Sequence, residues 1–225
     1  MGRIILSIPG PWAQMPDIKS PLSVEFLPPD PDIVREFEQL SRSAESFTPE
    51  ELKAIRKHQS LLRARLDFEG SGDFAYAKQA AQYCRAICKA GAYGIFVETA
   101  LKVIPPEPFG ELNCDDLVSL FHLFVEFYGD RKSIQSEGMQ SFGLPDVVVP
   151  FTRETRSFAQ GAAFALAARM VCDRMQPREG QRFRASESAH AYALHKEPAA
   201  EIEDDEEADF VNEAGRWRMD FADEL

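Results

Sequence analysis

Residues 136–146, which read Ser-Glu-Gly-Met-Gln-Ser-Phe-Gly-Leu-Pro-Asp, form the stretch best suited to chemistry. Its polar side chains are Ser136, Glu137, Ser141 and Asp146. Hydroxyls and carboxylates bind polar ligands, and a carboxylate can also transfer a proton. The same groups can instead satisfy the backbone of an irregular buried loop, so both roles stay open. Gly138 and Gly143 permit positive φ, which is typical of a tightly folded loop.

Three residues from other segments are candidates to share a cleft with this stretch. Glu98 and Lys102 follow a short apolar strand pattern, where we expect the chain to leave the sheet toward Pro105-Pro106. His122 lies in the most apolar helix pattern, next to its buried face and four residues before Glu126, so the two can also form a purely structural pair. The candidate catalytic residues are His122, Glu98 and Glu137, and the candidate binding residues are Ser136, Glu137, Ser141, Asp146 and Lys102.

Other patterns of catalytic or metal-binding residues do not assemble in the sequence. There is no Gly-x-Ser-x-Gly, no His-Glu-x-x-His and no Gly-rich phosphate loop. Cys84 and Cys88 share a helix face but have no second ligand pair, which favours buried packing thiols. His190 and His195 are five apart on one strand and so point to opposite faces. We therefore expect no metal site and no cofactor, and we expect His58 to be an exposed residue.

The chain is strongly acidic, and its charge bears on the class of partner. Its 225 residues carry a formal net charge of −12, with a pI of about 4.9. This charge argues against nucleic acid and anionic membrane as partners, and it suits a basic protein partner or simply serves solubility. Trp12 and Trp217 are candidates for exposed aromatic contacts with such a partner.

Three observations predict a cytoplasmic protein. The apolar start at residues 4–8 is too short for a signal peptide and ends at Pro9-Gly10-Pro11. No run approaches the length of about 18–20 apolar residues that a membrane span needs. The four cysteines lie in helix patterns, where reduced thiols are the economical interpretation.

The first half of the chain mixes strand and helix patterns. We expect strands at residues 3–8, 22–27, 61–68 and 93–97, and helices at 31–43, 49–59 and 73–90. The strand at 61–68 is the clearest, because apolar residues alternate with Arg63, Arg65 and Asp67. The helix at 49–59 begins with a capping box, Thr48-Pro49-Glu50-Glu51. Asp73 is the expected cap of the third helix.

The second half begins with the apolar helix that holds His122. Further elements are expected as a helix at 113–128, a strand at 147–149, a helix at 152–175, a hairpin of 182–186 with 189–195, and a last strand at 215–221. In the long helix, Phe158, Ala162 and Leu166 are predicted to lie on one buried side. The acidic run at 201–209 lacks calcium-loop spacing and is predicted to be an exposed loop.

This order of elements lacks a regular βαβ rhythm and predicts an α+β fold. We expect a mainly antiparallel or mixed sheet packed by four to five helices, in a single globular unit spanning residues 1–225. A division into two lobes, if present, would fall near residues 105–112, where Pro105-Pro106 interrupts the patterns.

Five segments together resemble an uncharacterised bacterial family that is classed as a domain of unknown function. They are residues 5–12, 96–102, 120–125, 136–146 and 215–219. The most specific part is the core pattern Gly-Met-x-x-Phe-Gly-Leu-Pro-Asp at residues 138–146. The resemblance covers nearly the whole chain and implies one bacterial unit, but it implies no mechanism.

Two classes of function remain open. The first is a non-enzymatic cytoplasmic protein of the immunity or adaptor type, which binds a basic protein partner and is supported by the net charge and the missing catalytic motifs. The second is an enzyme, a hydrolase or transferase, that works from residues 136–146. A cleft in which His122 meets Glu98 or Glu137 would favour the enzyme, and a packed His122 would favour the binding protein.

Overall fold

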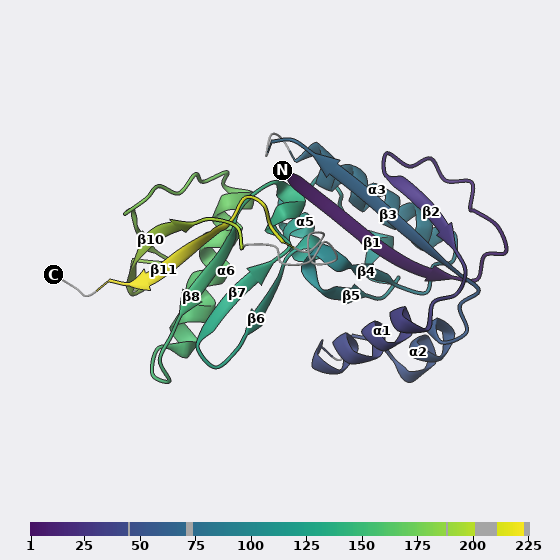
Figure 1. The fold of residues 1–225 in the computed structure, drawn as a ribbon, viewed down its shortest axis with the longest axis horizontal. Helices are drawn as coiled ribbons and strands as arrows, with labels where there is room; N and C mark the ends of the chain where they lie inside the picture. Colours follow the sequence, from purple (N-terminus) through teal and green to yellow (C-terminus); the bar gives the residue numbers. More distant parts are fainter. Residues whose placement is uncertain (45, 71–73, 188, 201–210, 223–225) are drawn as a thin grey trace.

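The computed structural model describes residues 1–44, 46–70, 74–187, 189–200 and 211–222. Their strands form two sheets, one from each half of the chain, which lie side by side (Figure 1). The helices are α1 (Pro31–Ala44), α2 (Pro49–Ile55), α3 (Ala75–Lys89), α4 (Pro108–Glu111), α5 (Leu117–Phe124) and α6 (Arg156–Cys172). Two short 3-10 turns are η1 (Glu98–Ala100) and η2 (Met139–Phe142). No helix in the described part of the chain is long and apolar enough to cross a membrane.

The first sheet is antiparallel, with the order β2-β3-β1-β4-β5. Its strands are β1 (Gly2–Gly10), β2 (Ser23–Leu27), β3 (Ser60–Phe68), β4 (Ile95–Val97) and β5 (Lys102–Ile104). β1 pairs with β3 along its whole length, from Gly2 opposite Phe68 to Gly10 opposite Ser60. The strong alternation in β3 predicted this strand from the sequence, but it did not identify β1 as its partner.

Helices cover both faces of this first sheet. Ile4 and Leu6 of β1 belong to the main core cluster together with Ala77 and Cys84 of α3. On the other face, α1 and α2 bury a smaller cluster around Phe37, which packs edge-on against Phe96 of β4. Each fully buried large apolar side chain contributes about 1.5–3 kcal/mol to folding.

The second sheet has the order β6-β7-β8-β11-β10-β9 and is mixed. Its strands are β6 (Glu126–Gly129), β7 (Ser133–Glu137), β8 (Asp146–Pro150), β9 (Arg182–Arg184), β10 (Ala191–Glu197) and β11 (Arg216–Phe221). β8 and β11 are parallel, and the remaining pairs are antiparallel.

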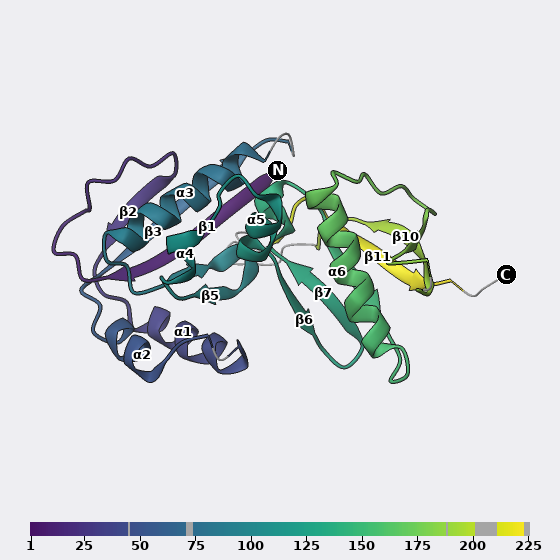
Figure 2. The same cartoon turned by 180° about the vertical axis from the view of Figure 1, so that it is seen from behind.

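α6 packs on one face of the second sheet (Figure 2). Val147 and Trp217, which lie opposite each other on β8 and β11, point to this face and share a core cluster with Leu166 of α6. Their strand neighbours, such as Val148 and Arg216, point the other way. Figure 1 shows no helix of the described residues over that other face, which is called the open face below.

The fold is a single globular α+β unit, as predicted from the order of elements. Most predicted strands and helices are present, and the capping box at the start of α2 is formed as predicted, with Thr48 and Glu51 bonded reciprocally. Residues 105–112 connect β5, the edge of the first sheet, to the segment before α5, and the two-lobe boundary there stays a prediction.

The prediction of a helix through residue 128 was wrong, because α5 ends at Phe124 and β6 begins at Glu126. The Lys102 ammonium donates to the His122 carbonyl oxygen (2.8 Å) and also contacts the Val125 carbonyl (3.5 Å). A cation at a helix C-terminus interacts favourably with the last carbonyls. The residues that follow pair with β7 instead.

The prediction that the chain leaves the sheet after residue 98 was also wrong. After η1 the chain turns through Leu101, which has a φ of 50°, and Lys102 begins the edge strand β5. Likewise, residues 136–146 are not loop throughout, since Ser136 and Glu137 end β7 and Asp146 begins β8. Strands this short show too little alternation to be recognised in a sequence.

Other local predictions fail for specific reasons. His58 is buried: its Nδ1 lies 2.8 Å from the Ile55 carbonyl oxygen, and its Nε2 accepts the Asp30 N–H (2.9 Å), so it joins the end of α2 to the start of α1. Trp217 is also buried, on the α6 side of β11. Phe158 is 50% exposed rather than packed with Ala162. The Asp73 cap and the acidic run at 201–209 lie outside the described residues.

Candidate functional site: a carboxyl-lined pocket

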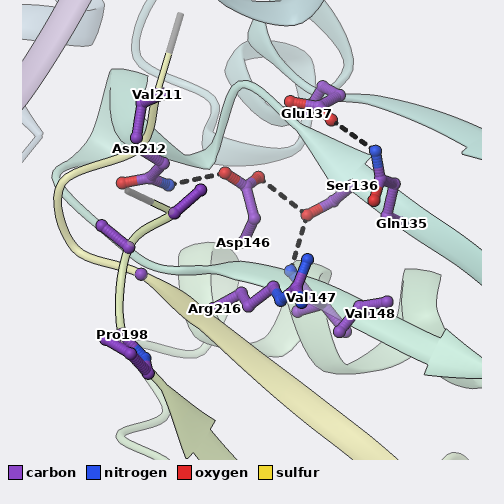
Figure 3. Close-up of a pocket in the computed structure, with 13 residues that line it drawn as sticks. Gln135, Ser136, Glu137, Asp146, Val147, Val148, Pro198, Val211, Asn212 and Arg216 are labelled. Carbon is purple, nitrogen blue, oxygen red and sulfur yellow. Dashed lines mark hydrogen bonds between the residues drawn. The ribbon is translucent and has the colours of Figure 1, made fainter. Parts of the chain in front are cut away.

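A pocket of about 240 Å³ lies where the end of β7 meets the starts of β8 and β11 (Figure 3). Its polar lining residues are Gln135, Ser136, Glu137, Asp146, Asn212 and Arg216. Parallel pairing of β8 with β11 places Arg216 directly opposite Asp146. The structure thus brings together three of the predicted binding residues, Ser136, Glu137 and Asp146, with partners far away in the sequence.

Asp146 is the most firmly held of these groups. Its Oδ1 accepts hydrogen bonds from the Ser136 hydroxyl (2.9 Å) and the Met139 N–H (3.3 Å), and its Oδ2 accepts one from the Asn212 amide (2.6 Å). Burial nevertheless raises the pKa of Asp146 to about 6, because desolvation of the charge outweighs these donors. The Ser136 hydroxyl in turn accepts the Val147 N–H (2.8 Å), so it bridges β7 to β8.

Glu137 is held less firmly and titrates near neutrality. The Gln135 amide donates to its Oε1 (2.8 Å), and within the described part of the chain the Glu137 side chain makes no other hydrogen bond. Burial and then the nearby Asp146 charge raise the pKa of Glu137 to about 7, although Gln135 and Arg216 act in the opposite direction. A carboxyl with a pKa of about 7 is half protonated at neutral pH, so its charge responds to any added ion.

Two glycines shape the turn that separates the carboxyls. Gly138 and Gly143, on either side of η2, have φ values of 99° and 66°. A Cβ added at Gly138 would overlap the Phe124 carbonyl oxygen and approach Ala100. Glycine at position 138 is therefore needed for both conformation and space, as the sequence suggested for conformation.

The remaining candidates from residues 98–141 lie elsewhere. Ser141 is fully buried, and its hydroxyl is 3.4 Å from that of Thr99. Glu98 is buried in the first half, where it accepts the Ser7 hydroxyl (2.5 Å) and pairs with Arg63 (3.3 Å). Both side chains are thus occupied by internal bonds.

His122 does not meet Glu98 or Glu137 in one cleft. It is exposed on α5, in a groove of about 520 Å³ that it shares with Lys102 and Phe164. Lys102 there pairs with Glu126 at 3.0 Å. Glu98 lines a third cavity beside Ser7. The three candidate catalytic residues therefore lie in three separate places.

Three polar residues of the pocket were missed from the sequence: Gln135, Asn212 and Arg216. The expected last strand already placed Trp217 and Met219 on one face, so Arg216 could have been assigned to the polar face. Asn212 followed by Gly215 is a turn signal, and Gly215 has a φ of 75°. What no local pattern shows is that this turn lies beside residues 136–146.

The described residues contain no group of three or more His, Cys, Asp or Glu side chains that could hold a metal ion. The four cysteines are unpaired thiols. Burial raises the pKa of Cys88 to about 12 and that of Cys84 well above its usual value, so both behave as packing residues.

Comparisons with family models, with curated proteins and with solved structures find no match to this chain. Membership of the bacterial family that the sequence resembles stays a prediction. Function must therefore be inferred from the geometry of the pocket.

Proposed function

We propose that this protein is a non-enzymatic binding protein of the adaptor or immunity type that engages a basic protein partner in the cytoplasm. In this proposal, a lysine or arginine side chain of the partner enters the pocket beside Glu137 and Asp146. The observation that carries it is the pair of carboxyls in one pocket, both with a raised pKa.

A cation is the ligand that best relieves this arrangement. Glu137 and Asp146 are disfavoured as carboxylates because they are desolvated and, for Glu137, because the other charge is near. A guanidinium or ammonium group between them offsets both effects. Arg216 does not supply this charge fully, because its Nε donates to Glu197 at 2.6 Å.

The size of the pocket also fits one side chain of a protein. Pockets for drug-sized ligands typically measure about 300–1,000 Å³. This pocket of about 240 Å³ is smaller and lies on the open face of the second sheet. The net charge of −12 would speed the encounter with a basic partner. The unpaired thiols support a reducing compartment.

The test is affinity capture from the host lysate at low and high salt, followed by calorimetry with the purified partner. Baits would be the wild-type chain, Glu137→Gln and, as a matched control, Glu50→Gln on the exposed start of α2. We expect a basic protein to be captured by the wild type and by the control, with about tenfold weaker binding to Glu137→Gln, the effect of losing about 1.4 kcal/mol.

Proton release gives a second measurement on the same complex. A bound cation lowers the pKa of Glu137 from about 7, so binding at neutral pH should release about half a proton. Calorimetry in two buffers of different ionisation enthalpy measures this number. Capture of no basic protein would contradict the proposal. It would also be contradicted if Glu137→Gln bound the partner as tightly as the wild type and the wild type released no proton on binding.

The enzyme remains a second candidate because of one observation. A carboxyl with a pKa of about 7 is suited to general acid–base catalysis at neutral pH. A hydrolase or transferase reaction would then use Glu137 as the proton-transfer group, with Asp146 and Asn212 holding the substrate. A screen for hydrolytic and transferase activity should find an activity that Glu137→Gln abolishes if this candidate is correct.

A further inference from the structure

Each sheet ends in a short strand with one unpaired edge, and the two edges face each other across the middle of the molecule (Figure 1). β5 pairs only with β4, and β6 pairs only with β7, among the described strands. The Lys102–Glu126 ion pair (3.0 Å) and the bond from the Tyr128 hydroxyl to the Leu101 carbonyl (2.5 Å) hold the edges together.

The turn between β6 and β7 determines which backbone groups of β6 point away from the sheet. At this turn the Asp130 N–H donates to the Ser133 carbonyl (3.0 Å). Hydrogen-bonded and non-hydrogen-bonded residue pairs alternate along an antiparallel ladder. The backbone N–H and C=O of Tyr128 therefore bond to β7, whereas those of Phe127 and Gly129 point outward, away from β7. The Phe127 N–H is held by the Glu126 carboxylate (3.0 Å), in the position that a neighbouring strand's carbonyl would take.

Two hollows flank this edge, one on each face of the sheet. On the α6 side lies the groove of about 520 Å³, walled by Phe127, Phe164 and His122. The ring of Phe164, which is 41% exposed, lies 5.7 Å from that of Phe127 and 5.9 Å from that of His122. On the opposite side lies a pocket of about 290 Å³ lined by apolar residues such as Leu101 and Val103.

We propose that the edge of β6 binds an extended peptide segment of a protein partner as an additional strand. Outward N–H and C=O groups specify a peptide backbone, and successive side chains of a strand point to opposite faces. The added strand would therefore place alternate side chains in the aromatic groove and in the smaller pocket. Because Lys102 and Glu126 neutralise each other, the segment carries uncharged apolar side chains at these positions.

This inference rests on the proposed function only in taking the partner to be a protein, and it concerns a different surface. The probe is a display library of random linear peptides, selected on the full-length chain. Hydrogen exchange with and without a selected peptide should show the Gly129 amide slowed more than tenfold. The Tyr128 amide should not change, because it already bonds to β7.

Variants and modified peptides test the geometry. Gly129→Pro removes an outward N–H while keeping the ladder to β7, so peptide binding should fall at least tenfold. A Cβ at position 129 overlaps only the flexible end of the Ile134 side chain. Phe164→Ala should weaken binding similarly, whereas Phe158→Ala, on the same helix but packed on His190, should not. N-methylation along the peptide should abolish binding at every second position.

Selection of no peptide, or binding that is indifferent to both Phe164→Ala and N-methylation, would overturn the proposal. If the peptide experiments fail but Glu137→Gln weakens capture of the partner, the strand proposal is contradicted and the pocket proposal is supported. Conversely, a strand-like N-methylation pattern combined with no effect of Glu137→Gln on capture would support the groove and contradict the pocket.

Discussion

The two sheets of this protein differ in how completely helices cover them. The first has helices on both faces, and its buried acid, Glu98, is matched by Ser7 and Arg63. The second has α6 on one face, and its open face carries Glu137 in a partly enclosed pocket with a pKa raised to about 7. In the pocket on this face, burial removes water from Glu137 and Asp146 without a fully compensating positive charge, so the pKa of each carboxyl is raised.

The largest change in stability is expected at Gly138, which packs against the end of α5. Gly138→Ala forces a side chain into a positive φ and against the Phe124 carbonyl, which should destabilise the protein by about 4 kcal/mol. Gly161→Ala, in α6 with open space around it, should instead stabilise the protein by about 0.5–1 kcal/mol. Urea unfolding measures the free energy of unfolding of both variants. An equal effect of the two changes would contradict the requirement for glycine at position 138.

Two buried serines offer the next comparison. Ser136→Ala leaves the Val147 N–H without its acceptor and takes a donor from Asp146, and should cost about 2–3 kcal/mol. Ser141→Ala removes only a 3.4 Å contact with Thr99 and should cost about 0.5 kcal/mol. Chemical denaturation of the two variants would contradict this account if Ser141→Ala proved the more damaging.

The pH dependence of stability should distinguish the open face from the covered sheet. The folded-state pKa of Glu137 is about 7, above its ordinary value of 4.5. Between these values the folded protein holds a proton that the unfolded chain has lost, so this group lowers stability as pH rises from about 4.5 to about 7. Glu137→Gln should remove about 1–2 kcal/mol of this decline. Unfolding free energies measured across this pH range would refute the assignment if the two slopes coincided.

A similarly small effect is expected where the edges of β5 and β6 meet. Tyr128→Phe deletes the hydroxyl that donates to the Leu101 carbonyl, which should cost about 0.5–1 kcal/mol. Thermal unfolding should show a correspondingly small drop in Tm. A loss above about 3 kcal/mol would mean that this contact holds the halves together far more strongly than one hydrogen bond can.

Elements with strong local patterns were predictable from the sequence. The alternation of β3 favours a strand locally, and the capping box of α2 favours a helix start locally. The tertiary structure agrees with both preferences. β5, β6 and β7 were missed because strands of three to five residues show too little alternation. α5 ends where the following residues pair with β7 as strand β6, a tertiary contact that no local pattern could reveal.

The candidate site was predictable only in part, for the same reason. Ser136, Glu137 and Asp146 stood out by residue type between two glycines, and they do meet in one pocket. Asn212 and Arg216 reach that pocket through the parallel pairing of β8 with β11, which joins segments about 70 residues apart. His58 was expected to be exposed, but its ring is buried between two backbone groups. Hydrogen bonds of this kind produce no hydrophobic periodicity that a sequence could show.

The most direct test of the central claim is the titration of the Glu137 carboxyl by carbon-13 NMR, with Glu137→Gln identifying the signal. We expect a midpoint near pH 7, shifted downward when N-acetyl-arginine amide is added as a model of the partner's side chain. A midpoint near the ordinary value of 4.5, unchanged by the added cation, would contradict it.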